Sequence, residues 1–289
     1  MMASNSNRPK SGMQKKLALG FDPGAGYNGS IAATPQLRRW RLMLRALTAV
    51  LLLASWPALS CADEQPDARA ILDRALHAAG LADKADLRAM TWKGKVKLYG
   101  AGDPVTYDGQ WFIGPPDRAR IEMRGQFHGR DFKRVLIVNG DRGWMVADGR
   151  AEALDGQRLD EERERLHAAW VATLSPVREA DFDLSTLRIP PAMVRIRSGL
   201  RVAHAGHRPV ELYFDRDGLL VESRTQRHDA NTGVRTNEVV RYGRFRNMDG
   251  VKLPTRLSVL VNGKLVVEGT VSAFRWHKRL DAALFERPE

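Results

Sequence analysis

Five of the six Asn-Gly and Asp-Gly dipeptides between residues 139 and 263 constrain the fold of this chain more than any other feature. Each stands between short segments in which apolar and polar residues alternate. Both dipeptides readily adopt the positive φ angles of tight hairpins, so each predicts that its flanking segments pair as antiparallel strands. Five hairpins indicate an antiparallel meander, in which consecutive strands are neighbours. The dipeptides are Asn139-Gly140, Asp148-Gly149, Asp217-Gly218, Asp249-Gly250 and Asn262-Gly263.

The alternation itself is clearest near the start of this region. Trp92, Gly94, Val96 and Leu98 alternate with three lysines, and residues 105–113 continue the same period of two. A period of two is typical of a strand with one buried and one solvated face. We expect further strands at 135–138, 143–146, 210–214, 219–223, 239–245, 253–261 and 265–274.

Two amphipathic segments predict helices that cover this sheet. The first begins at Pro66-Asp67 and ends at Gly80, a residue typical of helix C-termini. The second runs from Leu159 to Leu174 and stops at Ser175-Pro176. Its acidic and basic run at 160–165 predicts a solvated face carrying i,i+4 pairs such as Glu161 with Arg165. The expected fold class is therefore mainly β (α+β): a strongly curved antiparallel sheet with helices on its concave face.

Residues 38–62 have the pattern of a secretory signal peptide. Four arginines precede the apolar run Ala46–Leu53, and the small residues Ser60-Cys61-Ala62 follow it. The apolar run is too short for a transmembrane helix, which needs about 20 residues. We interpret residues 1–37 as a disordered or mis-annotated extension, 38–62 as the signal peptide and 63–289 as a single exported, periplasmic domain. Lipid anchoring through Cys61 is the alternative.

The net positive charge of the chain lies largely in residues 1–62. The chain carries a net charge of +12, but residues 1–62 hold eight of its bases and one acid. The remaining 38 bases face 33 acids, so the excess that would suggest nucleic-acid binding belongs largely to the leader. Cys61 is the chain's one cysteine, so the expected mature domain has no thiol for disulfides or metal.

Several motifs together resemble a family of exported proteins. They are Gly109-x-Trp111-Phe112, Asn139-Gly140-Asp141-x-Gly143-Trp144, Leu212-Tyr213-Phe214-Asp215, Asp249-Gly250-Val251-Lys252-Leu253-Pro254 and Leu280-Asp281-x-x-Leu284-Phe285. With the N-terminal helix, they resemble the LolA/LppX-like superfamily, which is related to the outer-membrane lipoprotein carriers. The resemblance spans roughly Ala70 to Pro288. It implies an incomplete β-barrel of about eleven strands whose apolar concave face is lidded by helices.

Motifs that would predict catalysis are missing from the sequence after residue 62. It contains no Gly-x-Ser-x-Gly, His-Glu-x-x-His or phosphate-binding glycine loop. Among its seven histidines, only His204 and His207 form a close pair, which Gly206 places in a turn. Because cysteine or carboxylate ligands at a characteristic spacing do not accompany them, we interpret the histidines as structural or exposed. We expect no enzyme activity, no metal and no cofactor.

The aromatic residues are the better functional candidates. An open half-barrel with few helices leaves part of its apolar lining uncovered, and such a lining can bind an acyl chain. We expect a non-catalytic carrier or sensor of lipid, lipoprotein acyl chains or another hydrophobic ligand, with envelope proteins as further partners. The alternatives are an enzyme or enzyme-associated envelope domain and a protein-binding scaffold. The candidate lining is Trp111, Trp144, Leu166, Trp170, Leu174, Phe214, Tyr242 and Phe274.

Overall fold

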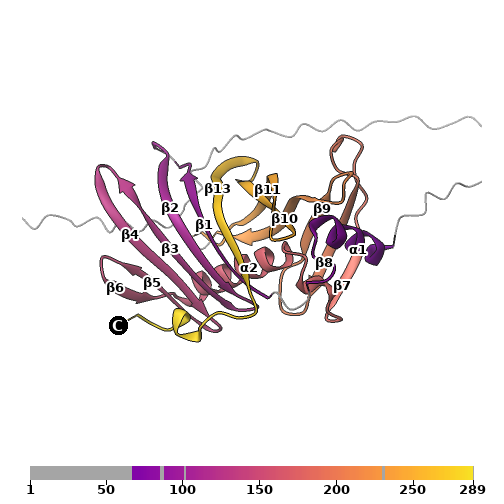
Figure 1. The fold of residues 1–289 in the computed structure, drawn as a ribbon. Coiled ribbons are helices and arrows are strands. Elements are labelled where there is room, and N and C mark those ends of the chain that lie inside the picture. Colours follow the sequence, from indigo (N-terminus) through magenta and orange to yellow (C-terminus); the bar gives the residue numbers. More distant parts are fainter. Residues whose placement is uncertain (1–66, 85–87, 101, 230–231, 289) are drawn as a thin grey trace, which may run out of the picture.

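A computed structural model describes residues 67–84, 88–100, 102–229 and 232–288. The expected N-terminal extension and signal peptide lie outside these residues. Within them, the chain forms thirteen antiparallel strands in one sheet and two α-helices (Figure 1). In this part of the chain no helix is long and apolar enough to cross a membrane.

The elements follow one another in a simple order. The helices are α1 (Ala68–Ala79) and α2 (Gly156–Val171), with short 3-10 helices η1 (Pro176–Arg178) and η2 (Ala282–Phe285). The strands are β1 (Ala89–Leu98), β2 (Val105–Gly114), β3 (Arg118–Phe127), β4 (Arg130–Asn139), β5 (Arg142–Ala147), β6 (Arg150–Ala153), β7 (Phe182–Thr186), β8 (Ser198–His204), β9 (Val210–Phe214), β10 (Leu220–His228), β11 (Arg235–Met248), β12 (Val251–Val261) and β13 (Lys264–His277).

Two meanders make up the sheet, and they meet where β1 pairs with β13. The strand order is β6-β5-β4-β3-β2-β1-β13-β12-β11-β10-β9-β8-β7, so β6 and β7 are the two edges. These edge strands are also the two that flank α2 in the sequence. The chain must therefore travel from one edge to the other between them, and α2 makes that crossing over one face (Figure 1).

The same helix shows how strongly the sheet bends. α2 contacts β4, which belongs to the first meander, and β10, which belongs to the second. The two strands are seven strand spacings apart, which is about 34 Å in a flat sheet. A helix of 16 residues is only about 24 Å long. The sheet must therefore curve around α2, and the face that carries the helix is the concave one.

All five predicted hairpin turns are present. Each joins two strands that are antiparallel neighbours, and the glycine of each has a φ between 62° and 83°. Asp148, Asp249 and Asn262 also have positive φ, the geometry expected of the first residue in such turns. Local turn chemistry therefore specified these pairings correctly.

Both predicted helices form, with small shifts at the second. At α1 the side chain of Asp67 accepts a hydrogen bond from the Arg69 amide, and Gly80 ends the helix in a left-handed conformation. α2 begins three residues earlier than predicted, because Asp155 caps it through the Arg158 amide. It ends at Val171, before the predicted stop.

Four strands were not predicted: β3, β6, β7 and β8. β3 alternates Ala119, Ile121 and Met123 with charged residues, but its turn to β4 is His128-Gly129. Both turn residues have positive φ, so this is a hairpin of the same kind without the Asn-Gly signature. The sheet accordingly has thirteen described strands where the resemblance implied about eleven.

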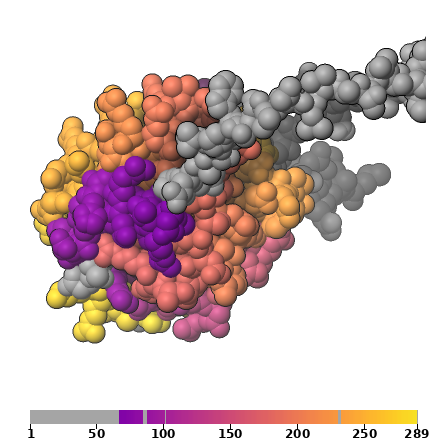
Figure 2. All heavy atoms as spheres, turned by 90° about the vertical axis from the view of Figure 1, so that its right-hand side faces the viewer, coloured from indigo at the N-terminus to yellow at the C-terminus, as the bar shows by residue number. Residues whose placement is uncertain are grey.

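The main core lies on the concave face. One cluster joins α1 and the end of α2 to β7–β10, and a second joins Leu159 and Leu166 of α2 to β1–β4. Figure 2 looks onto the α1 end of the molecule, where the polar side of that helix is exposed. On the opposite face η2 covers β3 and β4, and its Phe285 is fully buried. The sheet is thus covered on both sides near β3.

Candidate functional site

A continuous apolar surface, here called the apolar lining, occupies the concave face of β1–β4 and β13. Its members are paired across neighbouring strands, for example Trp92 with Trp111 and Phe274. Residues directly opposite in antiparallel strands share a face. The half-buried side chains of the apolar lining are Trp92, Leu98, Ile121, Met123, Phe132, Val267 and Phe274.

The centre of the apolar lining is a stacked tryptophan pair. The rings of Trp92 and Trp111 lie 3.5 Å apart with an interplanar angle of 3°. Gly109 makes room for this stack, because a Cβ there would lie only 2.1 Å from the Trp111 ring. Phe274 lies beside it and meets Trp276 edge-on, with ring centroids 5.1 Å apart. The pair is therefore a rigid aromatic platform whose Trp92 side is partly open to solvent.

Charged groups fix α2 across the concave face. Glu161, only 3% exposed, accepts hydrogen bonds from both terminal nitrogens of the Arg208 guanidinium. It also pairs with Arg227 of β10, which in turn bonds Glu238 of β11 at 2.8 Å. Burial acts to raise the pKa of Glu161, but the hydrogen bond and charge of Arg208, with Arg227, outweigh it and hold the pKa below its usual value.

The prediction of a solvated acidic face on this helix was therefore wrong. Glu161 is buried, and Glu164 accepts hydrogen bonds from His207 and from the Arg208 amide. Arg165 pairs with Glu162 instead of the predicted Glu161. The sequence pattern could not distinguish a solvated acidic face from one that meets basic residues of another element.

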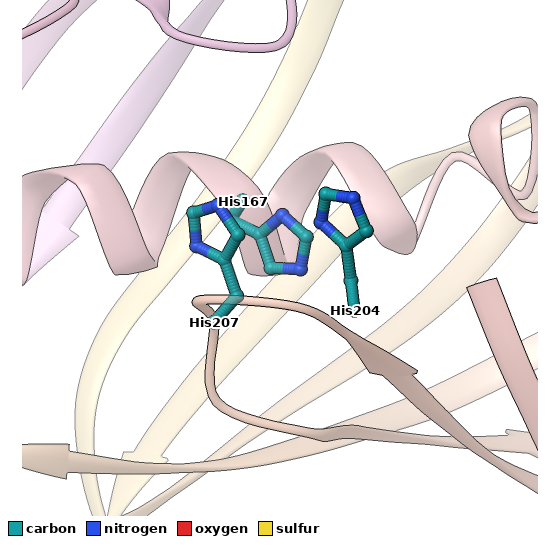
Figure 3. A group of neighbouring side chains, drawn as sticks. All are labelled: His167, His204 and His207. Carbon is teal, nitrogen blue, oxygen red and sulfur yellow. The ribbon is translucent and has the colours of Figure 1, made fainter. Parts of the chain in front are cut away.

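A cluster of three histidines lies where α2 meets the β8–β9 turn (Figure 3). His167 comes from α2, His204 ends β8, and His207 lies in the turn. One ring nitrogen of each lies within 4.8 Å of the others. The His167 and His207 rings stack with centroids 3.8 Å apart, and those of His167 and His204 are 5.3 Å apart. The cluster combines three potential metal ligands.

Carboxylates orient two of these rings. His207 Nδ1 lies 2.9 Å from Glu164 Oε1, and His204 Nε2 lies 3.2 Å from Asp181 Oδ2. His167 is 3% exposed, and burial, with the neighbouring His207 and His204, lowers its pKa to about 3. The His167 imidazole is therefore neutral at physiological pH.

The fold has relatives among solved structures, although no family model and no curated protein matches the sequence. A LolA superfamily protein from Nitrosomonas europaea superposes with a TM-score of 0.50 and 14% identity, over 76% of this chain and 97% of its own. The chain has a LolA-like fold. The resemblance inferred from the sequence is thus confirmed at the level of the fold.

Two further structures are similar with lower TM-scores. A putative outer membrane lipoprotein-sorting protein domain from Vibrio parahaemolyticus gives 0.47 at 9% identity, and a DUF1329 family protein from Desulfovibrio piger gives 0.48 at 14%. Each match covers 76% of this chain and 97% of the other. Identities this low do not carry over a function.

The eight predicted lining residues lie in three different apolar clusters of the structure. Trp111, Leu166 and Phe274 belong to the cluster of the apolar lining. Trp170, Leu174, Phe214 and Tyr242 lie in the α1 cluster, where Phe214 is fully buried. The eighth residue, Trp144, lies elsewhere. Of the seven half-buried side chains of the apolar lining, Phe274 was the one predicted to line the pocket. The alternation of apolar residues along the strands was the signal that could have identified the other six.

Trp144 lies on the opposite face from Trp111. Trp144 pairs with Ile137, and Ile137 pairs with Arg120. Arg120 pairs in turn with Phe112, so Trp144 and Phe112 share a face. Phe112 is the neighbour of Trp111 along β2. Neighbours along a strand point to opposite faces. Trp144 instead packs with Val135, Ile137 and Val146.

A groove of about 500 Å³ also lies on that opposite face. It runs between β1, β2, β13 and the C-terminal segment, and its walls include Lys93, Phe112, Arg275 and Leu284. Because its walls mix cationic and apolar groups, this groove differs in character from the apolar lining. Trp92 and Phe274 also border this groove, although most of its walls belong to the face opposite the predicted pocket.

The histidine cluster was missed from the sequence. The pair His204 and His207 was recognised, and the turn through Gly206 has the expected positive φ of 80°. His167 lies 37 residues before His204, on a helix whose docking no local pattern reveals. The predicted absence of a metal rested on spacing along the chain, which does not apply to ligands brought together by tertiary contact.

Proposed function

We propose that this protein is a non-catalytic, exported carrier or sensor that binds a lipid acyl chain or a similar hydrophobic molecule along the apolar lining. The observation that carries the proposal is the half-burial of seven large apolar side chains on the concave face. A fully packed core would bury them, and a solvated face would replace most of them with polar residues.

The physical gain from such binding is substantial. Each methylene group removed from water contributes about 0.8 kcal/mol, so an acyl chain gains affinity along its whole length. The stacked Trp92 and Trp111 provide a flat surface at the centre, and the flexible side chain of Met123 adapts to the ligand. The apolar lining itself supplies no charged group, so the proposed ligand contact is hydrophobic.

The exported location is part of the same proposal. It is supported by the basic, apolar and small-residue pattern of residues 38–62. A periplasmic carrier would protect acyl chains from water between membranes. Intact mass of the native protein should correspond to a chain that starts near Asp63, and detection of peptides from residues 5–36 in the mature protein would contradict both the cleavage and the misplaced start.

The direct test is to identify what the native protein contains. Protein purified from its own envelope is extracted with organic solvent, and the extract is analysed by mass spectrometry. A lipid at about one equivalent supports the proposal. Binding is then measured by titrating delipidated protein with oleate and following tryptophan fluorescence, which should shift because the ligand displaces water from Trp92.

A matched pair of variants separates the concave face from the rest of the surface. Met123→Asp places a carboxylate in the apolar lining, and burying it under an acyl chain is costly. Thr106→Asp adds the same charge at an exposed position on the other face, opposite Lys97. Oleate affinity should fall at least about tenfold in the first variant and stay unchanged in the second. Equal affinity in both variants would rule out the apolar lining as the site.

A further inference from the structure

The histidine cluster has a feature that ordinary packing does not explain. His204 Nδ1 is buried and has no hydrogen-bond partner among the described residues. A buried polar atom without a partner loses its hydration without compensation, which costs about 1–3 kcal/mol. Such an atom in a cluster of imidazoles is a potential ligand for a cation.

In two of the three rings, a carboxylate engages one nitrogen and leaves the other available. Asp181 engages Nε2 of His204 and leaves Nδ1, whereas Glu164 engages Nδ1 of His207 and leaves Nε2. A carboxylate that holds the far nitrogen of an imidazole fixes the tautomer and makes the other nitrogen a better ligand; this is the usual outer arrangement of histidine metal sites.

From this geometry we propose that His167, His204 and His207 bind one divalent transition-metal ion of the zinc class. In a tetrahedral site with metal–nitrogen bonds of 2.0–2.1 Å, ligand nitrogens are roughly 3.3 Å apart. The nitrogens now lie within 4.8 Å of one another, so metal binding requires the rings to rotate out of their present stacking. The proposal does not depend on lipid binding.

The surroundings suit a bound cation. Glu164 and Asp181 supply two negative charges next to three imidazoles, which together balance a divalent ion. The nearby Arg208 guanidinium is held by Glu161 instead of pointing its charge into the cluster. The His204 and His207 side chains are 20% and 25% exposed, so an ion can enter from solvent and retain water as a fourth ligand.

Metal binding would have a defined structural consequence. His167 lies on α2, whereas His204 and His207 lie on β8 and the turn after it. An ion held by all three ties the helix that crosses the concave face to the rim of the sheet. The bound ion would therefore stabilise the docking of α2 on the sheet.

The test uses the full-length chain, purified without a polyhistidine tag and stripped with a chelator. Isothermal titration with zinc should give one site per chain with a dissociation constant in the micromolar range or below, and thermal stability should rise with zinc concentration. Cobalt should give the intense visible absorption of a tetrahedral site. An absence of saturable binding, or binding of zinc without stabilisation, would overturn the proposal.

Variants locate the site. His207→Ala lies in a turn, so the fold should survive, and zinc affinity should fall by roughly 100-fold or more. Glu164→Gln should reduce affinity by roughly 10–100-fold, since it weakens the orientation of His207. His128→Ala, in the exposed β3–β4 turn, is the matched control and should bind as wild type. Unchanged affinity in both His204→Ala and His207→Ala would refute the site, even if zinc binds elsewhere.

Discussion

Glu161 of α2 and Arg208, which lies two residues before β9, form a bidentate ion pair with guanidinium–carboxylate distances of 3.0 and 2.6 Å. The pair connects the helix that crosses the concave face to the far half of the sheet. Arg227 and the amide of His228 add further contacts to the same carboxylate. α2 is therefore attached by charge as well as by its apolar side chains.

Glu161→Gln should destabilise the protein strongly, because it leaves Arg208 without its buried counter-charge and removes one of the two carboxylates that face Arg227. We expect a loss of about 3 kcal/mol in the free energy of unfolding, measured by urea denaturation. Glu162→Gln, one residue along α2, removes a more exposed carboxylate that pairs with Arg165, and should cost less than about 1 kcal/mol. Equal losses in both variants would show that the buried network contributes nothing beyond a surface pair.

The same carboxylate should make stability depend on acidic pH. The pKa of Glu161 is lowered in the folded state, so its contribution is complete above the unfolded value of 4.5 and is lost as pH falls through the folded pKa. The stability difference between wild type and Glu161→Gln should therefore stay constant from about pH 7 to about pH 5.5 and shrink below that. A difference that stays constant to about pH 3 would contradict the lowered pKa.

Gly109→Ala should disturb the tryptophan stack. The new Cβ would lie 2.1 Å from the Trp111 ring, which cannot move far because Trp92 stacks on it. We expect a loss of about 1–3 kcal/mol and a changed near-UV circular dichroism signal. Gly102→Ala is the control, since its Cβ would meet no atom within 4 Å. Wild-type spectra and stability in Gly109→Ala would mean that the ring repacks freely.

Phe285→Ala tests whether the C-terminal segment is an integral part of the core. Phe285 is fully buried on the opposite face, where it lies next to Gly114 and the Arg118 guanidinium. Removing the ring should cost about 3–5 kcal/mol in thermal or urea unfolding. The exposed neighbour Glu286→Ala should have almost no effect. A cost below about 1 kcal/mol would indicate that η2 is dispensable.

The amino-acid sequence by itself determined the local elements. Asn262-Gly263 and its four counterparts set their hairpins because positive φ is a property of the residues themselves. Asp67 and Gly80 set the ends of α1 through hydrogen bonds within a few residues. The alternation around Trp92 correctly predicted which side chains share a face of the strand. The LolA-like fold was inferred separately, from the resemblance of motifs such as Asn139-Gly140-Asp141-x-Gly143-Trp144 to a known superfamily.

Only the tertiary structure decided which distant elements meet. The β1–β13 pairing joins strands that are far apart in the chain, and it places the Trp92 strand at the centre of the sheet. The register from β2 to β5 puts Trp144 on the face opposite Trp111. Docking of α2 turned Glu161 from an expected surface residue into a buried partner of Arg208, and it brought His167 to His204 and His207. Such contacts depend on the curvature of the whole sheet, for which no short segment carries a signal.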